Sequence, residues 1–380
     1  MRVIKKHSIR LTEGFKEGLL HWAKQFEEVV WLDSNHHQQK HSKFKAILAV
    51  DAFTAIKTDY INAFEKLEEY QSKTKDWLFG YLTYDLKNDV EKLQSNNFDG
   101  LYFPDLYFFQ PKKIFLFSET EVEIQYQNFV DDELDVDWQE IIHLSKNLHY
   151  FNPDQLCKTD SLHEEKRRND LLNKTKESPI KIHLRTSKDS YYKKLSTMLD
   201  YIHKGDIYEA NFCQEFYSEN TIIDPEKTFI HLNDISKTPF ATFLKLDNHY
   251  LLSASPERYI KKTGSKIISQ PIKGTAKRHK NKKEDLKLIK ILENDQKERS
   301  ENIMITDLVR NDLSKFANKG TVKVEELCKV YTFEQVHQLI TTISCEVDET
   351  ISPIKIIKET FPMGSMTGAP KISAMKIIEE

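Results

Sequence analysis

Residues 269–278 read SQPIKGTAKR. The period-two alternation of this stretch predicts a β-strand in which Pro271, Lys273 and Thr275 share one face. A lysine at this position has two interpretations. It is either an edge-strand lysine in water, or an amine held beside apolar surface, which loses its proton more easily and attacks electrophilic carbon.

The preceding stretch, SASPERYI at residues 253–260, places Glu257 after Pro256 at the end of an apolar strand. Loops at strand ends commonly carry functional groups, so Glu257 is the candidate acid to accompany Lys273. A Pro-Glu-Arg turn is also common as a solvated surface turn, and the residues alone leave both interpretations open.

These two stretches belong to a wider pattern of strands and helices. In the first part of the chain, the sequence predicts strands at 29–32, 46–50, 114–117 and 120–126, and a helix at 60–70. In the second part it predicts a helix at 187–204 that ends at Gly205, strands at 211–217, 240–246, 250–254 and 266–272, a long helix at 284–317, a helical or mixed segment at 333–343, and a helix begun by Pro370. This order indicates an α+β fold with largely antiparallel sheet and helices outside it.

Composition divides the chain into three parts and excludes several classes of protein. Residues 152–181 are charged and poor in large apolar side chains, so we expect an N-terminal part at 1–150, a linker or crossover at 151–186 and a C-terminal part at 187–380. Hydrophobic residues make up 39% of the 380 residues and charged residues 30%, which excludes wholesale disorder. The 56 Lys and Arg against 59 Asp and Glu argue against binding of nucleic acid through bulk charge.

The sequence lacks the motifs of several further classes of protein. The sequence has no GxGxxG and no Walker-type phosphate loop, so dinucleotide and P-loop nucleotide binding are poorly supported. The four cysteines are widely spaced, and neither a signal peptide nor an apolar run of membrane-spanning length is present. We therefore expect a soluble cytoplasmic protein without a membrane or nucleic-acid partner.

The stretch KERSENIMITDLVRNDL, residues 297–313, carries paired carboxylates at helical spacing. Glu298 and Glu301 continue an apolar row, and buried carboxylates are unfavourable unless they are paired or bound to a cation. A hard divalent ion such as Mg²⁺ is one partner for them. Salt bridges to Lys297 or Arg299 are the other possibility.

The stretch FPMGSMTGAPKISAMKIIEE, residues 361–380, offers hydroxyl groups and glycine amides just before a predicted helix. Ser365 and Gly368 lie in this segment. Such an arrangement suits a carboxylate or phosphate, but it is equally an ordinary helix cap.

Taken in order, these stretches resemble the chorismate-utilising enzymes, a family that includes anthranilate synthase component I, aminodeoxychorismate synthase component I, and the isochorismate and salicylate synthases. The resemblance is carried by GDIYEANF (205–212), SASPERYI (253–260), PIKGT (271–275), ENIMITDLVRNDL (301–313) and GSMTGAPK (364–371). Residues 31–34 and 79–85 resemble N-terminal segments of the same family, so the resemblance covers nearly the whole chain. It implies a four-layer α/β/β/α sandwich of two mainly antiparallel sheets, in which the two halves of the chain interleave.

The resemblance also implies roles for the residues singled out above. Lys273 would attack C2 of the chorismate ring with loss of the C4 hydroxyl, Glu257 would assist that loss as general acid, and ammonia would then enter at C4 and expel the lysine. Acidic positions near a Mg²⁺ correspond to Glu298 and Glu301. Positions that line the chorismate pocket correspond to Gly274, Thr275, Ser365 and Gly368.

Three positions distinguish branches of the family. A lysine at 273 resembles aminodeoxychorismate synthase component I, whereas an alanine there resembles anthranilate synthase component I. The water-using relatives have a lysine where this chain has Glu209, which disfavours hydroxylation at C2. Many relatives have a histidine where this chain has Gln338, and we expect the neighbouring His337 to be a structural residue.

The implied activity is therefore the conversion of chorismate and ammonia to 4-amino-4-deoxychorismate in p-aminobenzoate and folate synthesis. The ammonia would come from a glutamine amidotransferase partner. Family members usually continue beyond the position of Glu380 and there supply an arginine, a glycine-rich turn and a further metal-binding glutamate. We expect the chain either to be a fragment or to bind metal and substrate poorly, and the alternatives are anthranilate synthase component I or a non-catalytic chorismate-binding subunit.

Overall fold

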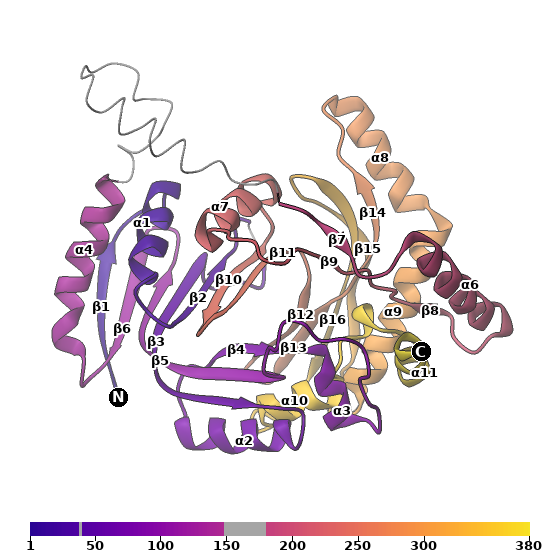
Figure 1. The fold of residues 1–380 in the computed structure, drawn as a ribbon, viewed down its shortest axis with the longest axis horizontal. Coiled ribbons are helices and arrows are strands. Elements are labelled where there is room, and N and C mark those ends of the chain that lie inside the picture. The colour runs from indigo at the N-terminus through magenta and orange to yellow at the C-terminus, as the bar shows by residue number, and fades with distance from the viewer. Residues whose placement is uncertain (38–39, 148–179) are drawn as a thin grey trace.

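A computed structural model describes residues 1–37, 40–147 and 180–380 of the chain. Two antiparallel sheets lie side by side, with helices on the outside of each (Figure 1). The four-layer α/β/β/α sandwich expected from the sequence is thus confirmed. Most of the predicted linker, 151–186, lies outside the described residues.

The first sheet has eight strands in the order β1-β6-β5-β3-β2-β10-β11, and β4 pairs with β5. Its last two strands come from the second part of the chain, so both parts of the chain build this sheet. The strands are β1 (Arg2–Ser8), β2 (Glu28–Asp33), β3 (Ala46–Thr58), β4 (Phe79–Leu82), β5 (Leu106–Phe117), β6 (Glu121–Gln127), β10 (Phe240–Leu246) and β11 (His249–Ser255).

Alternation along the central strands explains why helices cover one face of this sheet. On β2, Trp31 packs into the apolar cluster beneath the outer helices, whereas its neighbour Val30 belongs to the cluster on the opposite face. The helices on the outer face are α1 (Glu13–Ala23), α4 (Leu134–Asn147) and α7 (Pro225–Ser236). Helix α2 (Ala63–Thr74) and the short helix α3 (Lys87–Val90) also belong to the first part of the chain and lie between β3 and β5 in sequence.

The second sheet has the order β12-β13-β16-β14, and β15 also pairs with β16. Its strands are β12 (Arg258–Thr263), β13 (Lys266–Gln270), β14 (Ile272–Lys277), β15 (Lys323–Thr332) and β16 (Val336–Glu346). Ile305 and Val309 of helix α9 pack on Ile267 and Ile343 of this sheet. The accompanying helices are α8 (Lys282–Asn294), α9 (Gln296–Ser314) and α10 (Pro353–Thr360).

The remaining elements connect the two halves of the chain. Helix α6 (Lys188–Lys204) has Ser187 as N-cap and ends at Gly205 with a φ of 83°, which confirms the predicted bounds. The other elements are β7 (His183–Leu184), β8 (Glu209–Ala210), β9 (Phe216–Tyr217), β17 (Gly368–Ala369) and α11 (Lys371–Glu379). Among the described residues, no helix has both the length and the apolar character needed to cross a bilayer.

Three predicted elements were wrong. Within the predicted helical or mixed segment 333–343, residues 336–343 lie in strand β16 and none is helical, because the buried β-branched residues of this strand lie at the centre of the second sheet. The predicted long helix 284–317 is two helices, because Asp295 leaves the helical conformation (ψ 114°) and caps α9 by accepting from the backbone N–H of Glu298. The predicted strand 211–217 is reduced to β9, and residues 211–215 are irregular.

Candidate active site

The side chain of Lys273 lies inside the protein, next to the short strand β8. Its Nζ is 2.7 Å from Oε1 of Glu209 and 3.2 Å from Oδ1 of Asn211, and 17% of the side chain is exposed. The open-water interpretation of this lysine is therefore wrong. The two partners share one face of GDIYEANF, at a spacing of two residues, and sequence analysis did not single them out as neighbours of Lys273.

A β-bulge in β14 sets the position of this lysine. Ile272 pairs with Ile340 and Thr275 pairs with Gln338, so β14 has one more residue than its partner over this interval. Gly274 lies within the bulge and has a φ of 95°, a conformation that favours glycine. The bulge shifts Lys273 out of the regular ladder.

The side chain of Asn302 fills the gap in the ladder that the bulge leaves. Its Nδ2 donates to the backbone oxygens of Lys273 (3.1 Å) and Leu339 (3.0 Å), and its Oδ1 accepts from the Thr341 hydroxyl (2.5 Å). Asn302 is 1% exposed, so these bonds are made in the buried interior, where hydrogen bonds are stronger than in water. The signal in the sequence was a polar residue on the buried face of α9, next to the predicted metal ligand Glu301.

The Glu257 carboxyl lies close to the same lysine. The backbone N–H of Ile272 donates to Glu257 Oε1 at 3.1 Å. Burial raises the pKa of this carboxyl, and the Ser365 hydroxyl, the Ile272 N–H and the Lys273 ammonium each oppose that rise. The structure thus places Glu257 and Ser365 in one environment with Lys273.

The segment 364–369 reaches this site by pairing with β8. Gly368 pairs with Ala210 and Ala369 with Glu209, and the Asn211 side chain donates to the backbone oxygen of Ser365 at 2.5 Å. Gly368 has a φ of 153°, and a Cβ on it would lie 2.1 Å from the backbone oxygen of Glu209. The predicted pocket residue Gly368 therefore allows a close approach of two backbones, which keeps Glu209 beside Lys273.

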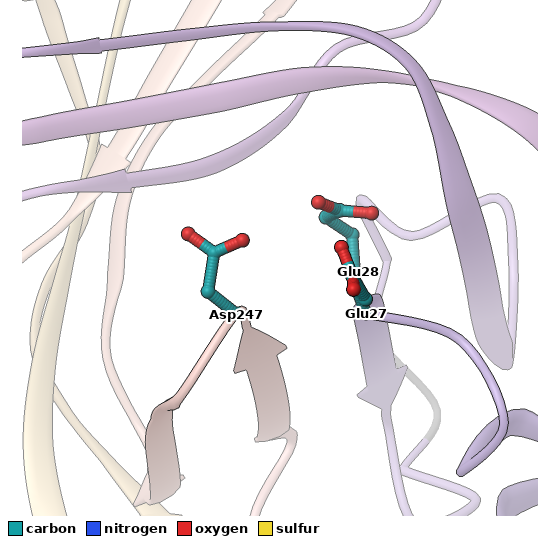
Figure 2. Close-up of side chains that lie close together, drawn as sticks. All are labelled: Glu27, Glu28 and Asp247. Atoms are coloured by element: carbon teal, nitrogen blue, oxygen red, sulfur yellow. The ribbon is translucent and has the colours of Figure 1, made fainter.

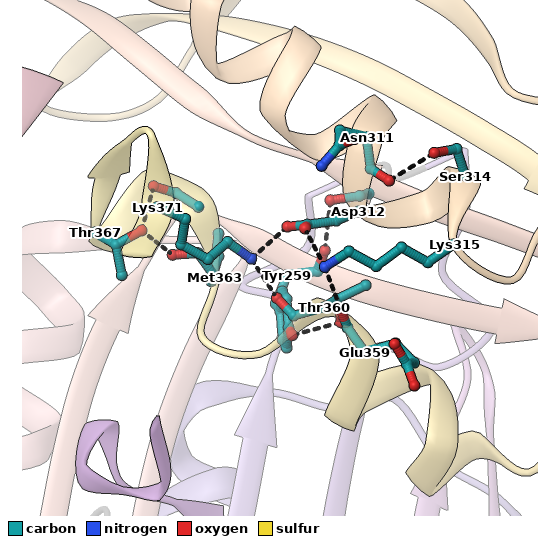
Figure 3. Close-up of polar contacts among 12 residues, drawn as sticks. Tyr259, Asn311, Asp312, Ser314, Lys315, Glu359, Thr360, Met363, Thr367 and Lys371 are labelled. Carbon is teal, nitrogen blue, oxygen red and sulfur yellow. Dashed lines mark hydrogen bonds and ion pairs between the residues drawn. The ribbon is translucent and has the colours of Figure 1, made fainter. Parts of the chain in front are cut away.

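A set of ion pairs and hydrogen bonds anchors the other side of this segment (Figure 3). Lys371 donates to Asp312 at 2.5 Å and to the backbone oxygen of Thr360 at 3.0 Å, and Lys315 also contacts Asp312. The Tyr259 and Thr360 hydroxyls lie 2.6 Å apart beneath them. Burial lowers the pKa of Lys371, which the Asp312 carboxylate opposes. These contacts join the start of α11 to α9 and α10.

The two predicted metal ligands lie on adjacent turns of α9. Glu298 faces Gly274, since a Cβ on that glycine would be 3.2 Å from its Oε2, and its carboxylate makes no ion pair or hydrogen bond with a described side chain. Glu301 lies 3.6 Å from Lys297, with 36% of its side chain exposed. Carboxylate oxygens that lack a strong partner fit a hard cation such as Mg²⁺.

One group of three carboxylates in the described residues lies close enough to share a cation, and it is elsewhere, at one end of β2 and the β10–β11 turn (Figure 2). Its members are Glu27, Glu28 and Asp247. Lys57 contacts Asp247, and the Tyr107 hydroxyl donates to Glu28 at 3.2 Å. These partners explain the group as part of the fold.

Thr275 lies on β14, and Gln338 and His337 lie on the neighbouring strand β16. Gln338 donates to the Thr275 hydroxyl at 3.5 Å, at the bulge. His337 is fully buried and bonds to Asp285 (2.9 Å) and Thr332 (2.9 Å) on the other side of β16. These contacts support the structural role expected for His337.

The family model for chorismate binding enzymes matches residues 27–380. The chain belongs to the chorismate-binding enzyme family. Over 194 residues it is 41% identical to aminodeoxychorismate synthase component 1 of Escherichia coli, a match that covers 51% of this chain and 43% of that relative. It is 30% identical over 313 residues to anthranilate synthase component 1 of Thermus thermophilus, which covers 79% of this chain and 61% of that relative. The chain thus spans about half the length of the curated relatives it matches.

A solved structure with the same fold is that of anthranilate synthase component I from Streptococcus pneumoniae. Its TM-score is 0.69 at 20% identity, and the match covers 90% of this chain and 80% of that chain. At this identity the likeness concerns the fold alone. It agrees with the two-sheet architecture of this member of the chorismate-binding family.

The close contact between Gly368 and β8 predicts that a methyl group added at Gly368 lowers the stability of the fold. Gly368→Ala should lower the free energy of unfolding by about 2–4 kcal/mol, because a rigid backbone oxygen occupies the place of the new Cβ and the φ is strained. Denaturant unfolding measures this change.

Gly364→Ala is the matched control, since its Cβ would meet the flexible Leu308 side chain at 2.7 Å. Its cost should be about 1 kcal/mol. An equal loss in both variants would contradict the close approach at Gly368.

Proposed function

We propose that this chain is the synthase component of aminodeoxychorismate formation, aminodeoxychorismate synthase component I. It converts chorismate and ammonia to 4-amino-4-deoxychorismate, in the synthesis of p-aminobenzoate and folate. The observation that carries the proposal is the buried amine of Lys273 beside the buried carboxyl of Glu257. A chorismate-binding family member with this pair has a nucleophile and an acid for displacement of the C4 hydroxyl.

Lys273 is the proposed nucleophile. Its amine gives up a proton and attacks ring carbon C2, the π electrons of the ring shift, and the C4 hydroxyl leaves as water. The bulge at Gly274 and the Asn302 bridge support this role, because they hold the lysine backbone at one place. Splitting one difficult substitution into two displacements lowers the barrier of each.

Glu257 is the proposed general acid for the departing hydroxyl. A raised pKa keeps its carboxyl protonated to higher pH than that of an exposed glutamate. The hydrogen bond from the Ile272 N–H fixes the direction of the carboxyl. With this proton, the C4 hydroxyl leaves as water, which is a better leaving group than hydroxide.

Substrate carboxylates require positive charge, and we propose that Mg²⁺ supplies it when bound at Glu298 and Glu301. The two side chains are one turn apart on α9, and Glu298 lies near Gly274, on the strand that carries Lys273. Gly274, Thr275, Ser365 and Gly368 are the proposed lining of the chorismate site. We propose that a glutamine amidotransferase partner delivers the ammonia.

The alternative is anthranilate synthase component I, which is the name of the Thermus thermophilus relative. Incubation of the chain with chorismate, ammonium and Mg²⁺ separates the two activities by their products. We expect 4-amino-4-deoxychorismate, identified by chromatography and mass, because a lysine stands at 273. Anthranilate as the main product would overturn the assignment, and turnover of neither kind would favour a non-catalytic chorismate-binding subunit.

The covalent step predicts a change in mass. With chorismate and no ammonia, the wild-type chain should gain the mass of chorismate less one water on Lys273, and Lys273→Ala should gain nothing and lose amination. Intact-mass and peptide measurements test this. Lys277→Ala is the control on the same strand, and its side chain is exposed. An adduct that persists in Lys273→Ala would contradict the nucleophile assignment.

The acid assignment predicts a pH dependence. A general acid acts only in its protonated form, and the raised pKa keeps Glu257 protonated to higher pH than an exposed glutamate. We therefore expect kcat/KM to fall as pH rises through the pKa of Glu257. Glu257→Gln should lower kcat/KM by about 10²–10⁴-fold and remove this limb of the profile. Glu226→Gln, at a buried glutamate of α7, is the control. An unaltered profile in Glu257→Gln would assign the acid elsewhere.

A further inference from the structure

Glu209 has one oxygen paired and one oxygen unsatisfied. Its Oε1 lies 2.7 Å from the Lys273 ammonium, and only 12% of the side chain is exposed. Its Oε2 is buried and makes no hydrogen bond with any described residue. Buried polar atoms normally have a partner, so this carboxylate has unused capacity to accept hydrogen bonds.

The second acceptor at this place has its orientation set by the protein. The Asn211 Nδ2 donates to the backbone oxygen of Ser365, and this bond turns Oδ1 toward the Lys273 ammonium. Glu209 and Asn211 together therefore present one negative charge and three acceptor oxygens around a cationic nitrogen. The lysine ammonium shows what this group of acceptors accommodates: a positively charged nitrogen with several N–H donors.

The covalent step removes that cation. When Lys273 becomes bonded to ring carbon C2, its ammonium nitrogen has lost two protons and is a neutral secondary amine. One of these protons replaces the proton that Glu257 gives to the departing hydroxyl, and the other leaves to solvent, so the Glu209 carboxylate is left buried without a counter-charge. An unpaired buried carboxylate is strongly unfavourable, so this state favours uptake of a replacement cation. The ammonium ion has the same charge and the same kind of donors as the lysine head group.

We propose that Glu209, assisted by Asn211, is the binding site for the ammonium ion that aminates the ring. This inference rests on the proposed function and adds to it the residue that receives the nitrogen substrate. Uptake of ammonium then follows formation of the lysine adduct, because only the adduct releases Glu209 from Lys273.

All protons of the second displacement can be exchanged among the bound ammonium, Glu209 and Lys273. Bound ammonium passes a proton to the Glu209 carboxylate, and the resulting ammonia forms a bond to C4. The ring π electrons shift back, and the C2–N bond to Lys273 breaks with its electron pair on Nζ. Two of the four ammonium hydrogens stay on the C4 amine and two reach Nζ, one of them through Glu209, so the Lys273 ammonium and the Glu209 carboxylate are restored.

Steady-state kinetics of Glu209→Gln test the proposal, because this variant keeps the shape and removes the charge. We expect the KM for ammonium to rise by about tenfold or more while the KM for chorismate is unchanged, since a charge-assisted hydrogen bond is lost at one substrate only. The lysine adduct should still form without ammonia. Glu215→Gln is the matched control, since that exposed glutamate pairs with Arg185. An unchanged KM for ammonium, or an equal rise in both KM values, would overturn the proposal.

A binding measurement tests the site independently of turnover. Lys273→Ala leaves Glu209 without its cation, so about 100 mM ammonium chloride should raise the Tm of this variant by about 2 °C relative to tetramethylammonium chloride. The double variant Lys273→Ala/Glu209→Gln should show no difference between the two salts. Equal effects of both salts on Lys273→Ala would refute an ammonium site.

The two measurements separate this inference from the proposed function. A wild-type chain that fails to aminate chorismate would refute the function, while ammonium stabilisation of Lys273→Ala would still support the site. A wild-type chain that aminates chorismate, with Glu209→Gln unaffected in its use of ammonium, would refute the site and leave the function standing.

Discussion

The ion pair between Lys273 and Glu209 is the interaction on which the arrangement of this site depends. Two separate constraints bring the partners to 2.7 Å. The bulge at Gly274, bridged by Asn302, fixes the lysine end, and the pairing of β8 with Gly368 fixes the glutamate end. Each partner is mostly buried, so each needs the other to compensate its charge.

The interleaving of the chain explains how such a site remains rigid. Strands β10 and β11 complete a sheet that the first part of the chain begins, and helix α10 packs against α2 through Ile354 and Phe64. The segment that carries Ser365 is in turn anchored by Lys371 on Asp312. Elements that are far apart in the chain thus meet around one lysine, which suits chemistry that needs a positioned amine and acid.

Much of the fold followed from local signals. Runs of β-rich residues between polar turns predicted strands β2 and β5, alternation predicted β6, and Gly205 predicted the end of α6. The errors came from segments whose neighbours outweigh local preference. β16 lies buried among three partner strands, and the capping geometry of Asp295 breaks a helical pattern that the spacing of apolar residues leaves continuous.

The sequence by itself determined the family, the layered α+β architecture and the residue types available for catalysis, because ordered motifs and periodic apolar positions are properties of the chain. Only the tertiary structure decided which side chains contact Lys273. Glu209, Asn211 and Asn302 lie 29 to 64 residues from it along the chain, and no local pattern encodes such contacts. They exist because a bulge and a close glycine contact bring three distant segments together, and burial then makes their charges and hydrogen bonds interdependent.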